Sequence, residues 1–340
     1  MVTIKDVARD AGVSVGTVSN VLNGSRVSEE RRLRVEASIQ KLGYQVNTLA
    51  RGLKTHKTDY VVVILPNLTN PFFSLLLAYL EKTLTLYHKQ IVLCISDAEK
   101  NKELHFIELA RRNKIDGVIG ITYTNIDDYI DDSMAFVSID RHFHEGIHVV
   151  SADNFEGGKL AAATLYERGS RNLLSFQTLS SLSTEVRKRQ QGFEAWCSEH
   201  QVSYSCNTFS EDQVKSVYSS YGSQDLIANV LRAYLGSAAE NRPKVDGIFA
   251  SSDHLALAIC EEIQKFGLRI PEDVQVIGFD GLRILNQGEP LVSSIEQPVP
   301  AIAEAAVDML LKLLNHENVE NVTNLPVRFL EGWSTRPRQA

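Results

Sequence analysis

The sequence predicts an α/β fold in which a small helical head precedes two lobes of doubly wound parallel sheet. Three short helical patterns occupy the first 43 residues, whereas from residue 59 onward apolar runs of strand length alternate with amphipathic helical patterns. This alternation restarts after residue 157, which indicates a second lobe. Charge divides in a similar way: residues 1–58 carry ten Lys or Arg and five Asp or Glu, a surplus of +5, so the other 282 residues must carry −12 to give the overall −7. A basic head on an acidic body is expected where only the head approaches phosphates.

The composition of the 340-residue chain is that of an ordinary globular protein, with 44% apolar and 23% charged residues. Its four cysteines are widely spaced and form no C-x-x-C pair, which is typical of a reducing compartment. The first residues lack the basic start and apolar run of a secretory signal, and no apolar stretch approaches the length of a membrane span. We therefore expect a cytoplasmic protein.

Two helices joined by a tight turn are predicted at the start of the chain. Thr3, with Asp6 three residues later, has the form of a capping box. Apolar residues at helical spacing predict a first helix over residues 4–11. Gly12 supplies the turn after it, and Ser14 is placed to cap the second helix.

A third helix is predicted after Ser28, which is placed to cap it, and Gly43 ends it. Three short helices around one small core complete a head that we assign to residues 1–46. The pattern fits a helix-turn-helix that binds DNA, and it equally fits a small helical bundle that binds nothing.

Residues 47–58 are predicted to form a hinge helix and a polar linker. Asn47 can cap a short helix, but Gly52 within it costs about 1 kcal/mol relative to alanine. Eight residues are also too few for a stable isolated helix. A segment of this kind is expected to become helical only on a partner, as a hinge does.

At these residues the sequence resembles the lactose/galactose-repressor family of transcriptional regulators. The motifs that match in order and spacing are Thr3-Ile4-Lys5-Asp6-Val7-Ala8, Ala11-Gly12-Val13-Ser14, Thr17-Val18-Ser19, Val21-Leu22-Asn23 and Asn47-x-x-Ala50-Arg51-x-Leu53. The resemblance implies that the second helix enters the major groove of DNA. It also implies that paired hinge helices of a dimer insert Leu53 into the minor groove, as an apolar wedge that kinks the duplex.

The positions expected to read the bases depart from the family's pattern. Val15 and Gly16 begin the reading helix, and Asn20 stands where arginine is usual. Gly16 offers no side chain, and Val15 can touch a thymine methyl group. Asn20 can pair with adenine where arginine would select guanine, so we hypothesise an A·T preference opposite Asn20.

Other residues of the head are expected to contact the phosphate backbone, which positions a protein without selecting a sequence. They are Thr17, Ser19, Arg26, Asn47 and Lys54. Helix capping or an ordinary solvated surface explains each of these residues equally well. The predicted DNA-binding set is completed by Thr3, Ser14, Ala50, Arg51 and Leu53.

Polar and aromatic side chains follow the predicted strands of the core. Ligands of open α/β sheets bind beyond the carboxyl ends of the strands, so these residues are candidates for effector binding. They are Asn70, Phe72, Phe73, Asp140, Arg141, Asp153, Arg189, Asp253 and Asp280. Donors and acceptors beside aromatic rings suit a polyhydroxylated ligand such as a sugar. Some of the set can instead be simple helix caps, as Asn70 and Asp253 can.

The family resemblance extends over nearly the whole chain. The core motifs that match are Asn70-Pro71-Phe72-Phe73, Asp153-Asn154 with Gly157-Gly158, Arg189-x-x-Gly192-Phe193, Ser252-Asp253 and Ile277-Gly278-Phe279-Asp280. The resemblance implies that residues 59–340 form an effector-binding and dimerisation core similar to periplasmic sugar-binding proteins, with three crossovers between its lobes. The implied lobes are about 59–156 with 292–318, and about 157–291 with 319–340. The matching arginine and aspartate bind ligand in the family, which points to Arg189 and Asp253.

Motifs of other functions are absent or weak. The sequence has no G-x-S-x-G elbow, no P-loop and no G-x-G-x-x-G after a strand, so neither an enzyme nor a cofactor is predicted. His142, His144 and His148 alternate as metal ligands could, but a surface loop is the simpler interpretation. Trp196, at helical spacing after Phe193, is expected in the core.

We therefore predict a repressor of a carbohydrate-utilisation operon, or less readily an activator, that binds a pseudo-palindromic operator as a homodimer. The chain ends soon after Trp333 without a heptad repeat, so a dimer and not a tetramer is expected. Closure of the lobes around an effector would bias the DNA-competent state. A phosphorylated protein partner in place of the sugar is an alternative, as in one branch of the family. A sugar-binding or transport protein and an enzyme of the same fold are the rival classes.

Overall fold

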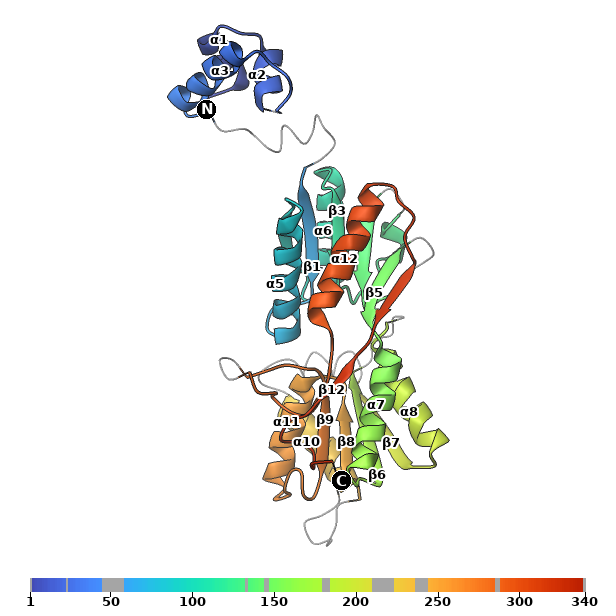
Figure 1. Ribbon diagram of the computed structural model, residues 1–340. Helices are drawn as coiled ribbons and strands as arrows, with labels where there is room; N and C mark the ends of the chain where they lie inside the picture. Colours follow the sequence, from blue (N-terminus) through green and yellow to red (C-terminus); the bar gives the residue numbers. More distant parts are fainter. Residues whose placement is uncertain are drawn as a thin grey trace. The chain divides into compact units, whose positions relative to one another are not determined.

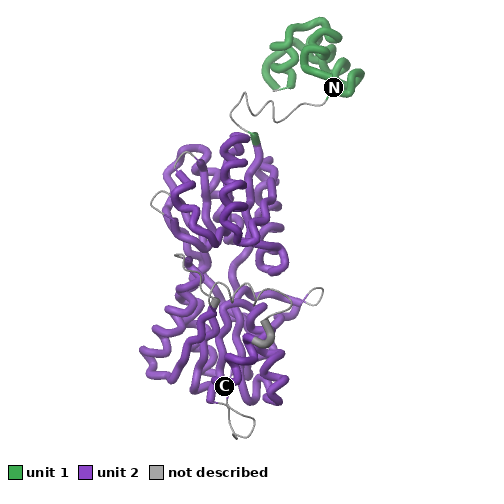
Figure 2. Tube along the Cα trace, turned by 180° about the vertical axis from the view of Figure 1, so that it is seen from behind, with its two compact units in different colours: residues 1–58 green, residues 59–340 purple. Residues whose placement is uncertain are grey.

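Two compact units, residues 1–58 and 59–340, make up the chain in the computed structural model (Figure 2). The first unit contains the helical head, and the second contains both lobes of the core. The structure describes residues 2–22, 24–44, 58–131, 134–143, 147–178, 184–209, 223–235, 244–284 and 288–338.

The head consists of three helices packed around a few small apolar side chains. They are α1 (Ile4–Ala11), α2 (Val15–Leu22) and α3 (Glu29–Leu42). Val7, Val18 and Val35, one from each helix, are fully buried. Gly12 and Gly43 end α1 and α3 in the left-handed conformation, with φ of 63° and 61°, which a residue without a Cβ adopts at least cost.

The first lobe is a six-stranded parallel sheet between helices (Figure 1). Its strands, in spatial order, are β11 (Val322–Leu325), β5 (His148–Ala152), β4 (Ala135–Ile139), β3 (Gly117–Gly120), β1 (Tyr60–Leu65) and β2 (Gln90–Ile95). Its helices are α5 (Pro71–Leu86), α6 (Lys100–Arg112), the short 3-10 helix η1 (Asp127–Tyr129) and α12 (Val299–Leu314). The all-apolar strands predicted such a sheet, because a parallel sheet is covered on both faces.

The second lobe repeats this plan, with one antiparallel edge strand. Its strands, in spatial order, are β12 (Arg328–Leu330), β10 (Ser294–Glu296), β9 (Gln275–Asp280), β8 (Gly247–Ala250), β6 (Asn172–Thr178) and β7 (Ser203–Phe209). Its helices are α7 (Asn154–Glu167), α8 (Arg187–Glu199), α10 (Ser223–Leu235) and α11 (Asp253–Lys265). Helices α7 and α8 pack together on one side, and α10 packs on α11 on the other (Figure 1).

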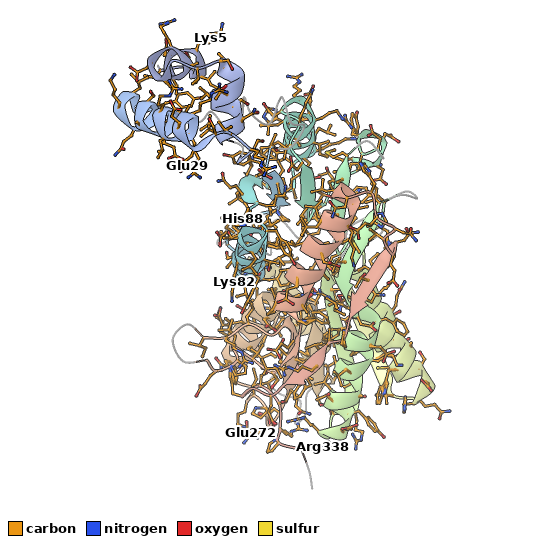
Figure 3. The ribbon with its side chains drawn as sticks, turned by 45° about the horizontal axis from the view of Figure 1, so that its top comes forward. Lys5, Glu29, Lys82, His88, Glu272 and Arg338 are labelled. Atoms are coloured by element: carbon orange, nitrogen blue, oxygen red, sulfur yellow. The ribbon has the colours of Figure 1, made fainter. Side chains whose placement is uncertain are left out.

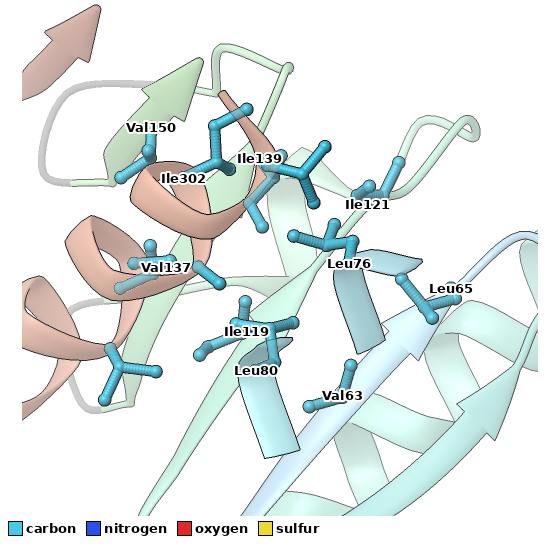
Figure 4. Packing of buried hydrophobic residues seen from close by; sticks show 14 of the residues in the cluster. Val63, Leu65, Leu76, Leu80, Ile119, Ile121, Val137, Ile139, Val150 and Ile302 are labelled. Atoms are coloured by element: carbon cyan, nitrogen blue, oxygen red, sulfur yellow. The ribbon is translucent and has the colours of Figure 1, made fainter. Parts of the chain in front are cut away.

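Each face of the first sheet has its own apolar core. Helices α5 and α12 lie side by side and bury the larger cluster, where Leu76, Leu80 and Ile302 meet Val63 and Ile119 of the strands (Figure 4). Helix α6 covers the opposite face through a separate cluster. Polar side chains that face the second lobe, such as Asp140 after β4, lie at the carboxyl ends of the strands.

The lobe boundaries differ from those predicted. Strand β10, in the stretch assigned to the first lobe, pairs with β9 of the second, and β11, assigned to the second lobe, pairs with β5 of the first. Helix α7 also packs on the helices and strands of the second lobe, although its first residues were assigned to the first. Strands β11 and β12 are consecutive in the chain but join different sheets, and an apolar pattern cannot say which of two sheets such a strand joins. The three predicted crossovers follow β5, β10 and β11.

Within the described part of the chain, no helix is both long enough and apolar enough to cross a bilayer. All four cysteines are free, and Cys94, Cys197 and Cys260 are buried. Trp196 is partly buried against the apolar cluster around α7 and α8, where its ring stacks on His200 at 4.1 Å. It is thus a residue of the core margin and not of its centre.

Candidate functional site

Short-range hydrogen bonds hold the starts of α1 and α2. The Asp6 carboxylate accepts from the backbone nitrogen of Thr3 at 3.0 Å and from its hydroxyl at 2.6 Å. The Ser14 hydroxyl accepts from the Thr17 nitrogen at 3.1 Å, which caps α2 as predicted. By contrast, Ser28 precedes α3 but makes no side-chain capping bond, because only its carbonyl serves that helix.

Helix α2 turns the predicted base-reading residues toward solvent. Val18 is buried, whereas Val15, Gly16 and Asn20 are exposed, with Val15 at 41% of its full area. Val15 is not part of the apolar cluster of the head, so its exposed side chain is available to a partner. The other predicted contacts on this part of the head, Thr3, Ser14 and Arg26, are also exposed, while Thr17 and Ser19 are half-buried.

The hinge predictions lie outside the described residues. They are Asn47, Ala50, Arg51, Leu53 and Lys54. These five residues therefore stay predictions from the family motif, and the structural evidence for a DNA-binding surface comes from α2 and its flanks.

In the core, the structure brings Arg189, Asp140 and Asp280 together where the two lobes meet. Asp140 follows β4 of the first lobe, and Asp280 ends β9 of the second. Arg189 lies in the first turn of α8, and its Nη1 is 4.0 Å from Oδ1 of Asp280. All three side chains are buried. We call this group, together with Asn154 and Gln297 described below, the lobe junction.

Arg189 is held in place on every side. Its Nε donates to Oδ1 of Asn154 at 2.7 Å and its Nη1 donates to the carbonyl of Ser251 at 2.5 Å. The guanidinium carbon lies 3.6 Å from the centre of the Phe279 ring, a cation–π contact. A planar group with several donors in fixed directions is suited to binding hydroxyl or phosphate oxygens.

The two aspartates are harder to ionise than free carboxylic acids. Burial raises the pKa of Asp140, and the charge of Arg189 and the Ser151 hydroxyl, 2.6 Å from Oδ1, offset it only in part. Burial also raises the pKa of Asp280 to about 7, against the opposing effects of Arg189 and of Gln297, while Asp140 adds to the rise. One guanidinium is thus shared by two buried carboxyl groups from different lobes.

Asp253, a predicted ligand residue, holds the chain next to Asp280 of the lobe junction. The cap of α11 is Ser252, whose hydroxyl accepts from the Leu255 nitrogen, so Asp253 is not the cap that the sequence allowed. Its carboxylate accepts from the Leu282 nitrogen at 2.6 Å and from the Ser294 hydroxyl at 2.5 Å. Burial and then the charge of Asp280 raise its pKa. These bonds fix the chain directly after Asp280.

Arg141, also predicted to bind ligand, is enclosed within the first lobe. Its guanidinium donates to Thr122 at 2.9 Å, to the carbonyl of Thr124 and to Asp127, and it stacks on Phe143 at 4.1 Å. Burial lowers its pKa, although Asp127 and Glu103 oppose this. In this structure the Arg141 side chain thus links parts of the first lobe, and its role in ligand binding stays a prediction.

The remaining predicted residues act locally. The Asn70 side chain caps α5 by accepting from the Phe72 nitrogen at 3.0 Å, and Asp153 caps α7 by accepting from the Glu156 nitrogen at 3.0 Å. Phe72 and Phe73 are buried in the first lobe's core with their rings edge to face. The simpler interpretation that the sequence left open, helix capping, accounts for both polar residues in this structure.

The predicted ligand set omits three buried polar residues at the carboxyl ends of strands, although Asn154 stands in one of the matched family motifs. Asn154 binds Arg189, and Nε2 of Gln297 donates to Oδ1 of Asp280 at 2.8 Å. Gln177, at the end of β6, is fully buried. Among the described residues, Oε1 of Gln177 and Oε1 of Gln297 have no hydrogen-bond partner. Their positions in the sequence could have identified them, because each residue follows or ends a strand at the edge of the sheet where ligands bind.

A second connection between the lobes lies beside the junction. The Glu185 nitrogen donates to the carbonyl of Asp140 at 2.9 Å, and Arg141 and Thr184 form a β-bridge. The buried Glu185 carboxylate also bonds His142 of the first lobe and Lys188. His142 is thus a partner of an acid, and no metal-binding group of His, Cys, Asp or Glu was found among the described residues.

A helix-turn-helix head followed by two strand-exchanged lobes with a polar junction defines the class of two-lobed DNA-binding regulators. Comparison with known proteins agrees with this class. Residues 3–47 match the model of bacterial regulatory proteins of the lacI family, and residues 162–335 match the periplasmic binding protein-like domain.

Relatives of full length support the same assignment. The sucrose operon repressor of Streptococcus mutans serotype c is 31% identical over 97% of this chain and 98% of its own. The structure of the lac repressor dimer bound to operator and the anti-inducer ONPF is 22% identical, covers 99% of both chains and superposes with a TM-score of 0.82, a likeness of fold. A periplasmic binding protein/LacI regulator from Alkaliphilus metalliredigens, complexed with D-xylulofuranose, is 26% identical over 82% of this chain and 99% of that one, with a TM-score of 0.66.

This chain belongs to the lacI family of bacterial regulatory proteins. It is a DNA-binding regulator of transcription and not an enzyme.

Proposed function

We propose that this chain is a homodimeric repressor of a carbohydrate-utilisation operon, controlled by a sugar or sugar phosphate at the lobe junction. The observation that carries the proposal is Arg189, fixed between Asp140 of one lobe and Asp280 of the other. A ligand that bonds to this group would contact both lobes at once. It would therefore change the free-energy difference between the open and the closed arrangement of the lobes.

The chemistry of the lobe junction suits a ligand with many hydroxyl groups. A hydroxyl both donates and accepts, so it can use the donors of Arg189 and the oxygens of the aspartates. The unbonded Oε1 atoms of Gln177 and Gln297 are acceptors that a sugar hydroxyl would satisfy. The sucrose repressor among the relatives and the D-xylulofuranose complex among the solved structures support a carbohydrate.

A thermal-shift screen of sugars and sugar phosphates tests the effector. A specific ligand at a hundredfold excess over its Kd stabilises the folded state by about 2.7 kcal/mol. Arg189→Met should abolish the shift, whereas Arg187→Met, two residues earlier on α8 and exposed, should keep it. If no carbohydrate shifts the wild-type protein, the sugar proposal fails and control by a phosphorylated protein becomes the better account.

Operator reading is proposed for the exposed side of α2. Val15, Gly16 and Asn20 would face the bases, and Thr17, Ser19, Arg26, Asn47 and Lys54 would contact the phosphate backbone. Leu53 would enter the minor groove as an apolar wedge, and Thr3, Ser14, Ala50 and Arg51 complete the proposed set. Selection from random duplexes with the full-length protein tests this. A pseudo-palindrome with an A·T pair opposite Asn20 is the expected result, and guanine there would contradict the assignment.

A dimer surface is proposed on the outer face of α5 and the neighbouring edge strand. Leu75, Tyr79 and Leu86 follow one another at helical spacing, and Leu75 and Leu86 are 42% and 72% exposed. Leu93 of β2 is also exposed and points to the α5 side, because its strand neighbours Val92 and Cys94 belong to the cluster beneath α6 and side chains alternate along a strand. Lys82, labelled in Figure 3, lies on the same stripe. Sedimentation should give a dimer, and Leu86→Glu should dissociate it. Because a protein that binds operator DNA must be in the same compartment as that DNA, we propose that it acts in the cytoplasm.

A further inference from the structure

The first residue of the core is held by bonds from neighbouring strands. The Asp59 nitrogen donates to Oδ2 of Asp116 at 3.1 Å, and its carbonyl accepts from the Gln90 nitrogen at 2.7 Å. Its carboxylate accepts from Nζ of Lys89 at 2.9 Å. Asp59 has a φ of 59°, in the left-handed region that few residues other than glycine, asparagine and aspartate adopt readily. Its backbone is therefore fixed in a particular direction.

Lys89 is the centre of this group. Its ammonium also donates to Oδ2 of Asp116 at 2.7 Å, so one cation joins the starts of β1, β2 and β3. The side chains of Lys89 and Asp116 are only 11% and 4% exposed, whereas that of Asp59 is 52% exposed. Burial lowers the pKa of Lys89, but its hydrogen bonds to Asp116 and Asp59 outweigh this and raise it. We call Lys89, Asp59 and Asp116 the clamp.

The clamp lies at the opposite end of the first sheet from the lobe junction. Strands β1, β2 and β3 begin at the clamp, and β4 of the same parallel sheet ends at Asp140. Figure 1 shows β1 pointing toward the second lobe, so that its start is the end farther from that lobe. Residues 47–58, assigned to the hinge, continue directly into Asp59 along the chain. His88, labelled in Figure 3, lies in the turn between α5 and β2, directly before Lys89.

We propose that Lys89 is a positioning residue for operator binding: by holding Asp59 against Asp116, it fixes the direction in which the hinge leaves the core. This inference rests on the proposed DNA-binding function. A rigid connection at Asp59 lets a movement of the first lobe become a movement of the hinge, whereas a loose connection absorbs it.

Loss of Lys89 should loosen the attachment of the first residue of the core and leave the lobe folded. Without the ammonium, the carboxylates of Asp59 and Asp116 would lose the cation that now bonds both of them. Asp59 can turn into water because half of its side chain is already exposed, while Asp116 remains within the lobe. Asp59 would then keep only its two backbone bonds, to Asp116 and Gln90, on an otherwise intact sheet.

The test uses the full-length protein and the operator that the wild type selects. Lys89→Met removes the charge and keeps the aliphatic stem, and it should weaken operator binding on the order of tenfold, a usual size for coupling between sites. Lys89→Arg keeps the charge and should restore affinity to within about twofold of wild type. Binding is compared at a temperature at which thermal unfolding shows every variant to be folded.

Two controls separate positioning from simple loss of stability or charge. Ile107→Val lowers the stability of the same lobe by about 1 kcal/mol from its buried core, away from the clamp. Lys102→Met removes a lysine that bonds Asp97 and Glu99 on the surface. Both controls should bind operator within about twofold of wild type.

Each result decides the matter. If the wild type selects no operator, the proposed function fails and this inference with it. If the wild type binds and Lys89→Met binds equally well, or if Lys89→Arg is as weak as Lys89→Met, the inference alone is overturned. Should Lys89→Met fail to fold, Asp59→Asn replaces it, because its side chain is half exposed. Asp59→Asn weakens the bond to Lys89, and an unchanged operator affinity would overturn the proposal.

Discussion

The α-carbon of Gly192 lies against the carbonyl group of Phe155, so closely that a Cβ at Gly192 would be 1.9 Å from that oxygen. The relationship is reciprocal, since a Cβ at Gly158 would lie 2.0 Å from the carbonyl oxygen of Arg189. Helices α7 and α8 therefore meet backbone to backbone, and this contact sets the place of Arg189 on α8. The two glycines recognised as family motifs thus hold the candidate ligand residue in position.

Gly192→Ala should damage stability and ligand binding together. The added methyl group meets rigid backbone, so α7 and α8 must separate, at a cost of about 1–3 kcal/mol in the free energy of unfolding. Arg189 moves with α8, and the ligand-induced thermal shift should fall with it. Gly16→Ala is the matched control, because its Cβ would meet only Ser14 Oγ at 3.7 Å, and alanine favours a helix by up to about 1 kcal/mol. The prediction is refuted if urea unfolding gives Gly192→Ala a higher free energy of unfolding than Gly16→Ala.

Arg141→Met distinguishes a supporting role from ligand contact. Removal of the guanidinium leaves the Thr122 hydroxyl and the Thr124 carbonyl without a donor beneath the lobe junction. Loss of one partner of a buried charged network costs about 3–5 kcal/mol, so the melting temperature should fall clearly. The shift that a saturating effector adds should stay close to the wild-type value. A stable variant that no longer responds to the effector would instead make Arg141 a ligand residue.

The stability of the protein should fall as the pH rises from about 4 to about 7, because of Asp280. The folded protein keeps the proton of Asp280 up to its pKa of about 7, whereas the unfolded chain loses it near 3.8. The contribution is therefore fully present below about pH 4 and is lost progressively toward pH 7, at no more than about 1.4 kcal/mol per pH unit.

Asp280→Asn should flatten this dependence, as measured by urea unfolding at several pH values between about 4.5 and 6.5. Asp273→Asn serves as the control. The pKa of Asp273 is lowered to about 2 by its bonds to Arg269, so its contribution is lost only as the pH falls from 3.8 toward 2. An unaltered slope in Asp280→Asn would show that other groups carry the titration.

Asn20→Arg should change which operator is bound. Asparagine pairs with adenine and arginine with guanine, and one such pair is worth about 1–3 kcal/mol of discrimination. Duplex selection with the variant should therefore replace A·T by G·C at one position in each half-site and leave the rest unchanged. Gln40→Ala, an exposed change on α3, should select the wild-type operator. An identical operator for Asn20→Arg would remove Asn20 from the reading surface.

The sequence predicted the head helices and most core strands because local signals define them. The apolar periods, the capping serine of α2 and the glycines after α1 and α3 act within a few residues. Arg189 and Asp280 could also be chosen from their positions at a helix start and a strand end. The parts that could not be predicted depend on tertiary contacts. Nothing near Arg141 in the chain shows that Thr122 and Asp127 enclose it, and nothing near β11 shows which lobe it completes.

The crossing of the chain between lobes also bears on how the protein is made. Strands β11 and β12 are the last two strands described, and they are edge strands of different sheets. A ribosome that has synthesised residues up to 320 has therefore completed neither lobe, although the head and all the described core helices have already been synthesised. The core should acquire its final stability only when about twenty further residues emerge. A shortened chain that ends before β11 would deprive both lobes of an edge strand at once.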